Sequence, residues 1–420
     1  MNLVKNLCNV LGIYFGFRFP EEKKLFKKFI KRGNFMELMG YQRKDSNVGF
    51  RNYVAVLPSV GCANDVVMRI VRMFPNALAL THRQGCAQLG EDKEQAFRTL
   101  SGLGKNPNIA GVLVVGMGCE SITAEDLSHE ISKSKKIVEC LGVLKEGGLV
   151  GSLGKATRIL RDMTNKVSKM KRTPCDMDKL TLGIKCGLTD TTSGLSSNPA
   201  TGIVANKVIE QGGTVVFGET PEVIGAEHIL LKRVVNEETK QKLLFFVDEC
   251  EKRVKASGFD IRGANPSPGN IKGGITSIEE KSLGAIKKAG DAPLQGALKY
   301  GEVPGGKGLY FMDGPGRTPE ALTGLNAVGA QIIIFPTGGG SPAGTLISPV
   351  IKVTGNPKTA LTKKDHIDVD VSSIITGKQI IKNAAEKIYE ELINVASGKV
   401  TKAEAYGYGG LSVWNIGVHM

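Results

Sequence analysis

The sequence predicts an α/β protein with two lobes, each built on a mainly parallel sheet with crossover helices. Short apolar runs alternate with helix-like segments along most of the chain, and such runs are typical of buried parallel strands. Many of these runs end at glycine, which accounts for 53 of the 420 residues. Because ligands bind beyond the carboxyl ends of strands in such sheets, we expect the active-site loops there.

The first lobe is expected over residues 36–172. We expect its elements in this order: strand 52–58, helix 64–74, strand 77–81, helix 91–101, strand 110–116, helix 123–133, a short apolar run at 137–138 and a basic helix at about 153–170. Residues 171–178 contain Pro174 and have little apolar character, so we expect them to connect the two lobes.

The second lobe is expected over residues 173–420. We expect its elements in this order: strand 180–185, helix 199–211, strand 213–217, helices from 221 and 237, helix 318–328, strand 331–335 and a final helix at 377–396. Residues 260–316 are rich in glycine and proline and show little periodicity, so they are predicted to form a long loop region. A loop of that length in a compact domain is usually functional or disordered.

Residues 1–35 are interpreted either as a basic amphipathic extension or as the product of a wrongly assigned start, with Met36 the true one. The first 44 residues carry ten Lys or Arg against three Glu, which is half of the net charge of +14. The rest of the chain has only a mild basic excess, and no aromatic-interleaved basic motif is recognised, so nucleic-acid binding is disfavoured. Apolar runs stay shorter than the about 20 residues that a membrane span needs, so none is expected.

Three predicted strands end at a Gly-Cys pair, at Cys62, Cys86 and Cys119. A long chain with a large core has little need of disulfides, so its eight cysteines favour a reducing cytoplasm. If the three strands share one sheet, their thiols lie at one edge of it. His82 lies four residues before Cys86, and a His and a Cys on one loop can bind a soft or borderline metal.

The predicted metal ligands are His82, Cys86, Cys119 and Glu120. Glu120 and Cys119 would lie at the start of a helix, where backbone amides stabilise a thiolate or an anion. The alternative is structural, with a histidine bonded to backbone and cysteines that only pack. A rival metal site is an iron–sulfur cluster on Cys62, Cys86 and Cys119.

Polar loops follow the strands of the second lobe. The loop after residue 184 contains hydroxyl groups and an aspartate, which suit a polyhydroxylated or anionic substrate, although an internally bonded loop is the alternative. The candidate catalytic residues are Lys185, Asp190, Glu219 and Asp313. The candidate substrate-binding residues are Thr191, Thr192, Ser193, Gly338, Gly339 and Gly340, the glycines through a backbone nest. Neither a P-loop nor a GxGxxG motif is present, so the common nucleotide-binding motifs are excluded.

From about residue 40 to its end, the chain resembles the altronate dehydratase and galactarate dehydratase family, which also includes sulfolactate sulfo-lyase large subunits. The matching segments are Gly40–Arg43, Arg51–Val54, Gly85-Cys86, Gly116–Glu120, Asp190–Leu195, Gly218–Glu222, Asn265–Asn270, Gly308–Asp313 and Val350–Asn356. The chain departs from the family at Ala87, where a glycine is common, and at Gly339, where a larger polar residue is expected. The small N-terminal domain of the fused dehydratases is also missing from the match.

The resemblance implies a metal-dependent lyase, typically with Fe²⁺ or Mn²⁺. The leading hypothesis is β-elimination of water from a sugar acid similar to altronate or galactarate, which gives a 2-keto-3-deoxy acid. The alternative substrate is sulfolactate, with sulfite and pyruvate as products. A hypothesis of another class is a non-catalytic subunit that binds an acidic metabolite. A separate small subunit that supplies the missing domain and a homo-oligomeric state are the expected partnerships.

Overall fold

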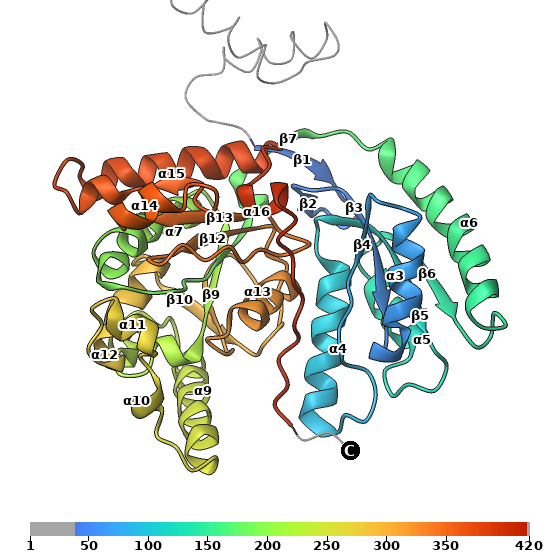
Figure 1. Cartoon of the computed structure of the whole chain (residues 1–420), viewed down its shortest axis with the longest axis horizontal. Helices are drawn as coiled ribbons and strands as arrows, with labels where there is room; N and C mark the ends of the chain where they lie inside the picture. Colours follow the sequence, from blue (N-terminus) through green and yellow to red (C-terminus); the bar gives the residue numbers. More distant parts are fainter. Residues whose placement is uncertain (1–37, 418–420) are drawn as a thin grey trace, which may run out of the picture. The chain divides into compact units, whose positions relative to one another are not determined.

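The computed structural model describes residues 38–417, so the predicted basic extension at 1–35 lies outside the described residues. Within them the protein has the predicted α/β fold, with two parallel sheets and one small antiparallel sheet (Figure 1). No helix in residues 38–417 is long and apolar enough to cross a membrane.

The smaller parallel sheet has four strands in the order β4-β3-β5-β6. Its strands are β3 (Tyr53–Pro58), β4 (Ala77–Ala79), β5 (Ile109–Gly116) and β6 (Ile137–Gly142). Its helices are α3 (Asn64–Arg72), α4 (Gly90–Lys105), α5 (Ala124–Ser132) and α6 (Leu149–Ser168). Apolar residues of α3 and α6 form the core on one face of the sheet, and those of α4 and α5 form the core on the other. The strand and helix predictions for this region are therefore confirmed.

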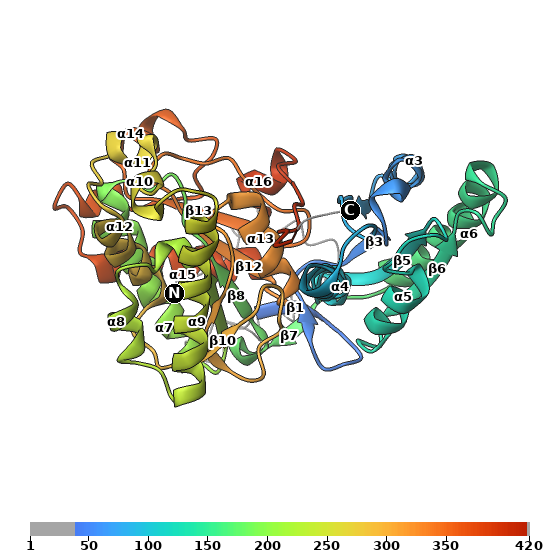
Figure 2. The same cartoon turned by 90° about the horizontal axis from the view of Figure 1, so that it is seen from below.

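The larger parallel sheet has seven strands in the order β10-β11-β9-β8-β12-β13-β14. They are β8 (Thr181–Ile184), β9 (Thr214–Gly218), β10 (Leu294–Leu298), β11 (Gly308–Met312), β12 (Ile332–Pro336), β13 (Val350–Thr354) and β14 (Val369–Asp370). One face packs on α7 (Asn198–Glu210), α9 (Glu237–Ala256) and α15 (Ile381–Ala396), and the other packs on α13 (Thr318–Ala327) (Figure 2).

Short elements complete the described chain. The short α-helices are α8 (Glu227–Leu231), α10 (Ile261–Ala264), α11 (Pro268–Lys272), α12 (Ile278–Ala285), α14 (Pro357–Thr362) and α16 (Lys402–Ala405). Single helical turns lie at Gly61–Ala63, Met177–Lys179, Thr220–Glu222, Ile286–Ala289 and Ser372–Ile374, and a π-helical turn lies at Ser193–Ser197.

The structure corrects two expectations from the sequence. Residues 260–316 do not form one long loop, because α10, α11, α12, β10 and β11 lie within them. These elements are too short to show a period, and α11 is fixed locally by a capping box at Ser267 with proline in its first turn. Residues 171–178 are not only a connection, since β7 (Thr173–Cys175) pairs with β1 (Leu38–Gln42), which also pairs with β2 (Val48–Gly49).

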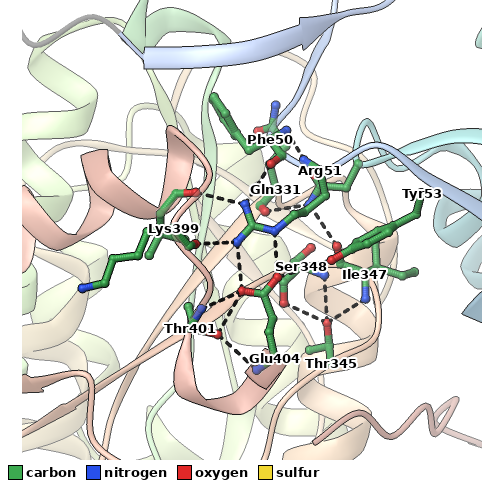
Figure 3. Close-up of polar contacts among 12 residues, drawn as sticks. Phe50, Arg51, Tyr53, Gln331, Thr345, Ile347, Ser348, Lys399, Thr401 and Glu404 are labelled. Atoms are coloured by element: carbon green, nitrogen blue, oxygen red, sulfur yellow. Dashed lines mark hydrogen bonds and ion pairs between the residues drawn. The ribbon is translucent and has the colours of Figure 1, made fainter. Parts of the chain in front are cut away.

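A buried ion pair fixes the segment after β2 to the C-terminal helices (Figure 3). The Arg51 guanidinium donates to both carboxylate oxygens of Glu404, at 2.7 and 2.8 Å. It also donates to the backbone carbonyls of Phe50, Val395 and Lys399 at 2.8–3.0 Å. All of its donor directions are therefore used, which stabilises the ends of α15 and α16 against residues far earlier in the chain.

The two parallel sheets are linked where α4 packs on α13. The backbones approach so closely that a Cβ on Gly102 would lie 2.3 Å from the carbonyl oxygen of Ala327. Any side chain at Gly102 would therefore push the two helices apart. Asn108, between α4 and β5, adds hydrogen bonds from its side chain to the carbonyls of Gln331 and Ile347 at 2.8 and 3.0 Å.

Candidate active site at the carboxyl edges of the parallel sheets

The loops after β3, β4 and β5 meet at one edge of the four-stranded sheet, so these three strands do share one sheet as the Gly-Cys pattern required. The Gly85 carbonyl accepts hydrogen bonds from the amide and hydroxyl of Ser121, both at 3.0 Å. The Ser59 hydroxyl donates to Glu120 at 2.8 Å. Gly85 has a φ of +102°, and a Cβ there would lie 2.1 Å from the Ser59 carbonyl. The thiols of Cys62, Cys86 and Cys119 are exposed on these loops.

His82 is buried at this edge, and both of its ring nitrogens have backbone partners. Nε2 lies 2.7 Å from the Pro58 carbonyl, and Nδ1 accepts a hydrogen bond from the Gln84 amide at 3.0 Å. Burial lowers the pKa of His82 to about 4, so the ring is neutral near pH 7. In this conformation His82 does not fit the role of a metal ligand, because a metal would have to replace one of these two hydrogen bonds.

Glu120 folds back onto its own loop. One carboxylate oxygen accepts from the amides of Gly118 and Cys119 at 2.6 and 2.9 Å. Burial opposes ionisation, but these hydrogen bonds and that from Ser59 lower the pKa of Glu120 overall. Within residues 38–417 no three His, Cys, Asp or Glu side chains are grouped so that they could hold a metal ion. The predicted metal site therefore stays a prediction, carried by the exposed thiols and Glu120 rather than by His82.

The carboxyl edge of the seven-stranded sheet holds a buried charge cluster. Glu219, which follows β9, lies with Oε1 2.8 Å from Nζ of Lys185 and with Oε2 3.4 Å from Nζ of Lys288. All three side chains are at most 2% exposed. Lys185 follows β8, whereas Lys288 comes from the turn Ile286–Ala289, so the carboxylate joins lysines from two different segments. The structure thus brings two of the four predicted catalytic residues together.

This cluster contains one more cation than anion. Burial opposes the ionisation of Glu219, but Lys185 and Lys288 lower its pKa overall, so Glu219 is a carboxylate. Burial also opposes the charge on Lys288, but Glu219, Glu222 and the hydrogen bond to Cys186 raise its pKa overall, so it is an ammonium. Nζ of Lys288 lies 3.2 Å from Sγ of Cys186, whose pKa burial raises to about 11. With Cys186 a neutral thiol, two lysines face one carboxylate in a site closed to water.

Glu219 itself adopts a strained backbone. Its φ is +78°, in the left-handed region that residues with a Cβ rarely occupy. The amide of Cys186 donates to its Oε2 at 3.1 Å, which helps to hold the side chain between the two lysines. Strained residues of this kind often belong to functional sites, where the surrounding structure fixes them.

Asp190, the third predicted catalytic residue, is fully engaged within the protein. Oδ1 accepts hydrogen bonds from the Thr192 hydroxyl at 2.7 Å and from the amide and hydroxyl of Ser193 at 2.9 and 3.0 Å. Oδ2 accepts from the Asn356 side chain at 2.7 Å. A Cβ on Gly338 would lie 2.2 Å from Cγ of Asp190. Asp190 therefore ties the loop after β8 to the loop after β13, and Gly338 of the loop after β12 lies close against it.

The glycine loop after β12 does not present a free nest. The Gly339 amide donates to the Leu188 carbonyl at 2.9 Å, and the amides of Gly340 and Ser341 both donate to the Thr337 hydroxyl at 3.1 Å. Substrate binding by these amides therefore stays a prediction that requires this loop to rearrange. Thr191 also bonds internally, through its amide to the Gly273 carbonyl at 3.1 Å.

Asp313, the fourth predicted catalytic residue, lies apart from the lysines in a pocket of about 320 Å³ beyond β9 and β11. The Thr220 hydroxyl donates to it at 2.5 Å. Arg253 and Trp414 line the same pocket, with the guanidinium 5.1 Å from the ring centroid. Burial raises the pKa of Asp313. A larger pocket of about 570 Å³ lies at the opposite edge, beside the first residues of β8 and β9, and contains none of the predicted site residues.

The strand order identifies β8 and β12 as the switch point of the larger sheet. After β8 the chain adds β9, β10 and β11 on one side, and then β12, β13 and β14 on the other. In open parallel sheets ligands bind in the crevice at such a point, beyond the carboxyl ends of the strands. Lys185, Asp190 and the loop containing Gly338 all lie there, which makes this the candidate binding region.

Two lysines near the switch point are not among the residues predicted from the sequence. Lys288 lies in the region expected to be a long loop. Lys352 lies in the middle of β13, with Nζ 5.6 Å from the centroid of the Phe335 ring; Nζ of Lys185 lies 5.3 Å from the same centroid. Lys352 could have been found from the sequence because it interrupts the apolar run of β13. Lysine is rarely buried without a partner, so a lysine in such a run is a candidate functional residue.

Comparisons with known proteins show which family the sequence matches. Residues 40–168 match the family model described as D-galactarate dehydratase/altronate hydrolase, second domain, and residues 177–419 match D-galactarate/altronate dehydratase, C-terminal. The chain is 37% identical over 372 residues to (2R)-sulfolactate sulfo-lyase subunit beta of Chromohalobacter salexigens, covering 88% of this chain and 95% of that protein. It is 32% identical over 394 residues to altronate dehydratase of Bacillus subtilis, covering 90% and 78%. It is also 32% identical over 380 residues to galactarate dehydratase (L-threo-forming) of Escherichia coli, covering 86% and 72%.

Proposed function

The chain belongs to the D-galactarate/altronate dehydratase family, and on this premise we propose that it is a lyase that eliminates a β-substituent from a 2-hydroxy acid. Two of the relatives are named as dehydratases and one as a sulfo-lyase subunit. Loss of water from a sugar acid and loss of sulfite from sulfolactate both begin with removal of the proton on the carbon next to the carboxylate. The two reactions therefore share this first step and differ only in the group that leaves.

The buried cluster of Lys185, Glu219 and Lys288 is the observation that supports this proposal. Removal of the α-proton spreads negative charge over the substrate carboxylate, and that charge needs compensation in the transition state. The cluster offers one uncompensated cation at the switch point, inside a site closed to water. A fixed charge in such an environment stabilises an anion much more than an exposed lysine would.

The roles of the other candidate residues follow from their contacts. We propose that Asp190 is a positioning residue, because its hydrogen-bond partners are protein groups that hold loops together. Asp313 follows β11, which is separated from β12 by two strands of the sheet. With about 4.8 Å between neighbouring strands, a small acid at the switch point does not also reach Asp313 unless the loops move. Asp313 therefore remains a candidate acid of the neighbouring pocket.

The leading substrate class is a sugar acid similar to altronate or galactarate, with a 2-keto-3-deoxy acid as product. Sulfolactate is the second candidate, because the sulfo-lyase subunit is covered over 95% of its length and at the higher identity of 37%. The name "subunit beta" of that relative supports a separate small partner subunit for this chain too. We also propose a homo-oligomer, and the exposed thiols favour a reducing cytoplasm.

We also propose that the enzyme uses Fe²⁺ or Mn²⁺, with Cys86, Cys119 and Glu120 as the candidate ligands, which would have to come together on binding because no such group of three is formed within residues 38–417. An iron–sulfur cluster on Cys62, Cys86 and Cys119 is the rival. A bound metal would supply Lewis-acid stabilisation of the substrate's developing charge. Metal analysis of protein purified without oxygen distinguishes these proposals: absence of acid-labile sulfide excludes the cluster, and absence of any bound metal excludes both.

An anaerobic assay tests the function. The full chain, with either metal ion and with or without the partner subunit, is given altronate, galactarate or sulfolactate, and 2-keto acid and sulfite are measured. Elimination from one of the three supports the proposal, and the product identifies the leaving group. Binding of an acid in calorimetry without turnover would instead support a non-catalytic binding subunit. Glu219→Gln should lose turnover, whereas Glu386→Gln, an exposed surface change, should not.

A further inference from the structure

We propose that Lys352 is the general base of this elimination, and that its side-chain amine removes the α-proton of the bound acid. The proposal rests on the function proposed above and assigns one of its steps to a residue. Lys352 is the third residue of β13 and pairs in register with Phe335 of β12. It therefore lies one strand from the switch point between β8 and β12.

The alternation of side chains along β13 decides where Lys352 points. Ile351 and Val353, on either side of it, belong to the core that packs on α7 and α15. Because successive side chains of a strand point to opposite faces, Lys352 points to the face covered by α13. Phe335 packs on that face, and the amines of Lys185 and Lys352 both lie within 6 Å of the centre of its ring. The two lysines thus share one aromatic neighbour at the proposed binding region.

Lys352 lacks the partners that a buried ammonium needs. Its side chain is 1% exposed, and one hydrogen bond from Nζ is present, to the Pro342 carbonyl at 3.2 Å. Within residues 38–417 it forms no ion pair with an Asp or Glu side chain, whereas Lys185 and Lys288 both do. A charged amine with two unfilled N–H groups is costly to bury, but a neutral amine has a lone pair ready to accept a proton.

The charges around Lys352 are consistent with a neutral amine over part of the physiological range. Burial lowers the pKa of Lys352 to about 8, and Asp368 opposes this effect. The Asp368 carboxylate accepts from the backbone amides of Lys352 and Lys402, at 2.8 and 2.9 Å, and does not pair with the amine. A base whose pKa lies near the working pH is the efficient choice for proton abstraction.

The step balances without any further reactant. The lone pair of the amine takes the α-proton, the electrons of that C–H bond form the double bond to the β-carbon, and the β-substituent leaves with its bonding pair. The resulting enol becomes the 2-keto acid, and the ammonium later returns its proton to solvent. Pro342 lies in the loop between β12 and β13, so substrate that reaches the amine replaces this carbonyl and displaces that loop.

The test compares variants at Lys352 with wild type in the full chain. Lys352→Met removes the amine at similar volume, and Lys352→Arg keeps a cation that cannot act as a base. We expect kcat to fall at least 10²-fold in both variants, the usual contribution of general-base catalysis, with KM changed by less than a few-fold. The matched control is Lys382→Met, an exposed lysine on α15, which should keep wild-type turnover.

Two further measurements separate a base from a structural cation. In wild type, kcat/KM should rise with pH to a plateau with a midpoint near 8, and this transition should vanish from the residual activity of the variants. Added ethylamine should restore part of the turnover of Lys352→Ala, because it supplies a free base to the vacated space. Full activity in Lys352→Arg, or unchanged pH dependence in Lys352→Met, would overturn the assignment. Inactivity of wild type itself on all three acids would instead refute the proposed function, and the assignment with it.

Discussion

The carboxylate of Glu219 lies 2.8 Å from the ammonium of Lys185, and both side chains are almost fully buried where β9 and β8 end. Lys288 approaches the other oxygen of the same carboxylate at 3.4 Å. An ion pair closed to water contributes little net stability, but removal of one partner leaves the other charge uncompensated. The cluster should therefore be far more sensitive to substitution than the surface ion pairs of this protein.

Glu219→Gln should lower the free energy of unfolding by about 3–5 kcal/mol, because two buried ammonium groups lose their counter-charge. The measurement is urea unfolding at pH 7. The control is Glu386→Gln, which breaks an ion pair with Lys207 at 2.7 Å in which Glu386 is half exposed, and it should cost at most about 1 kcal/mol. Equal losses in the two variants would contradict the role assigned to the cluster.

Gly338→Ala should disrupt the switch point. A Cβ there would lie 2.2 Å from Cγ of Asp190, whose carboxylate is held by hydrogen bonds and cannot simply turn away. We expect a loss of about 1–3 kcal/mol in unfolding free energy, as for other overpacked sites, together with loss of turnover. Gly305→Ala is the matched control, since no atom lies within 4 Å of the place that its new methyl group would take, and it should change neither quantity appreciably.

Asp313→Asn should make the protein relatively more stable as the pH rises. Burial raises the pKa of Asp313, so the folded state binds this proton more tightly than the unfolded state does. As the pH rises above about 4, the ordinary pKa of a carboxyl group, wild type therefore loses stability, and the loss ends once the pH exceeds the pKa of Asp313 in the folded state. The asparagine variant has no such proton and shows no such loss. The stability difference between the two proteins should shift toward the variant as the pH rises above about 4. A difference independent of pH would show that the pKa of Asp313 is not raised.

Arg51→Met should destabilise the protein by about 3–5 kcal/mol, because it removes the buried guanidinium that pairs with Glu404 and donates to three backbone carbonyls. A double-mutant cycle with Glu404→Gln isolates the part carried by the ion pair. We expect a coupling energy of about 1–3 kcal/mol between the two changes in urea unfolding. Strict additivity of the two changes would mean that the carbonyl contacts alone carry the effect.

The sequence predicted the elements whose patterns are local. The apolar run of β5 and the cysteine-containing turns after β3, β4 and β5 were visible because parallel strands leave a continuous apolar signature. The pairing of Lys185 with Glu219 could have been predicted from the sequence, since both residues follow predicted strands. Lys288 was not, because it comes from a turn in a segment without periodicity and reaches the cluster only through the tertiary fold.

The state of individual side chains was harder to predict than their location. His82 was correctly placed at the end of a strand, but its ring nitrogens are occupied by the Pro58 carbonyl and the Gln84 amide. Asp190 was a candidate catalytic residue, and its carboxylate is bonded to protein groups of the loops after β8 and β13. Such contacts depend on backbone groups that become neighbours only after folding, and a residue type in a sequence does not report them.

The order in which the chain is synthesised gives the contact between Arg51 and Glu404 a further consequence. The two residues are 353 positions apart, so the ion pair cannot form until nearly the whole polypeptide has left the ribosome. The strands and helices between residues 53 and 168 can meet earlier, as their partners are close in sequence. A nascent chain would thus carry a formed first sheet beside an unsatisfied arginine, and a protein shortened before α16 would keep that defect permanently.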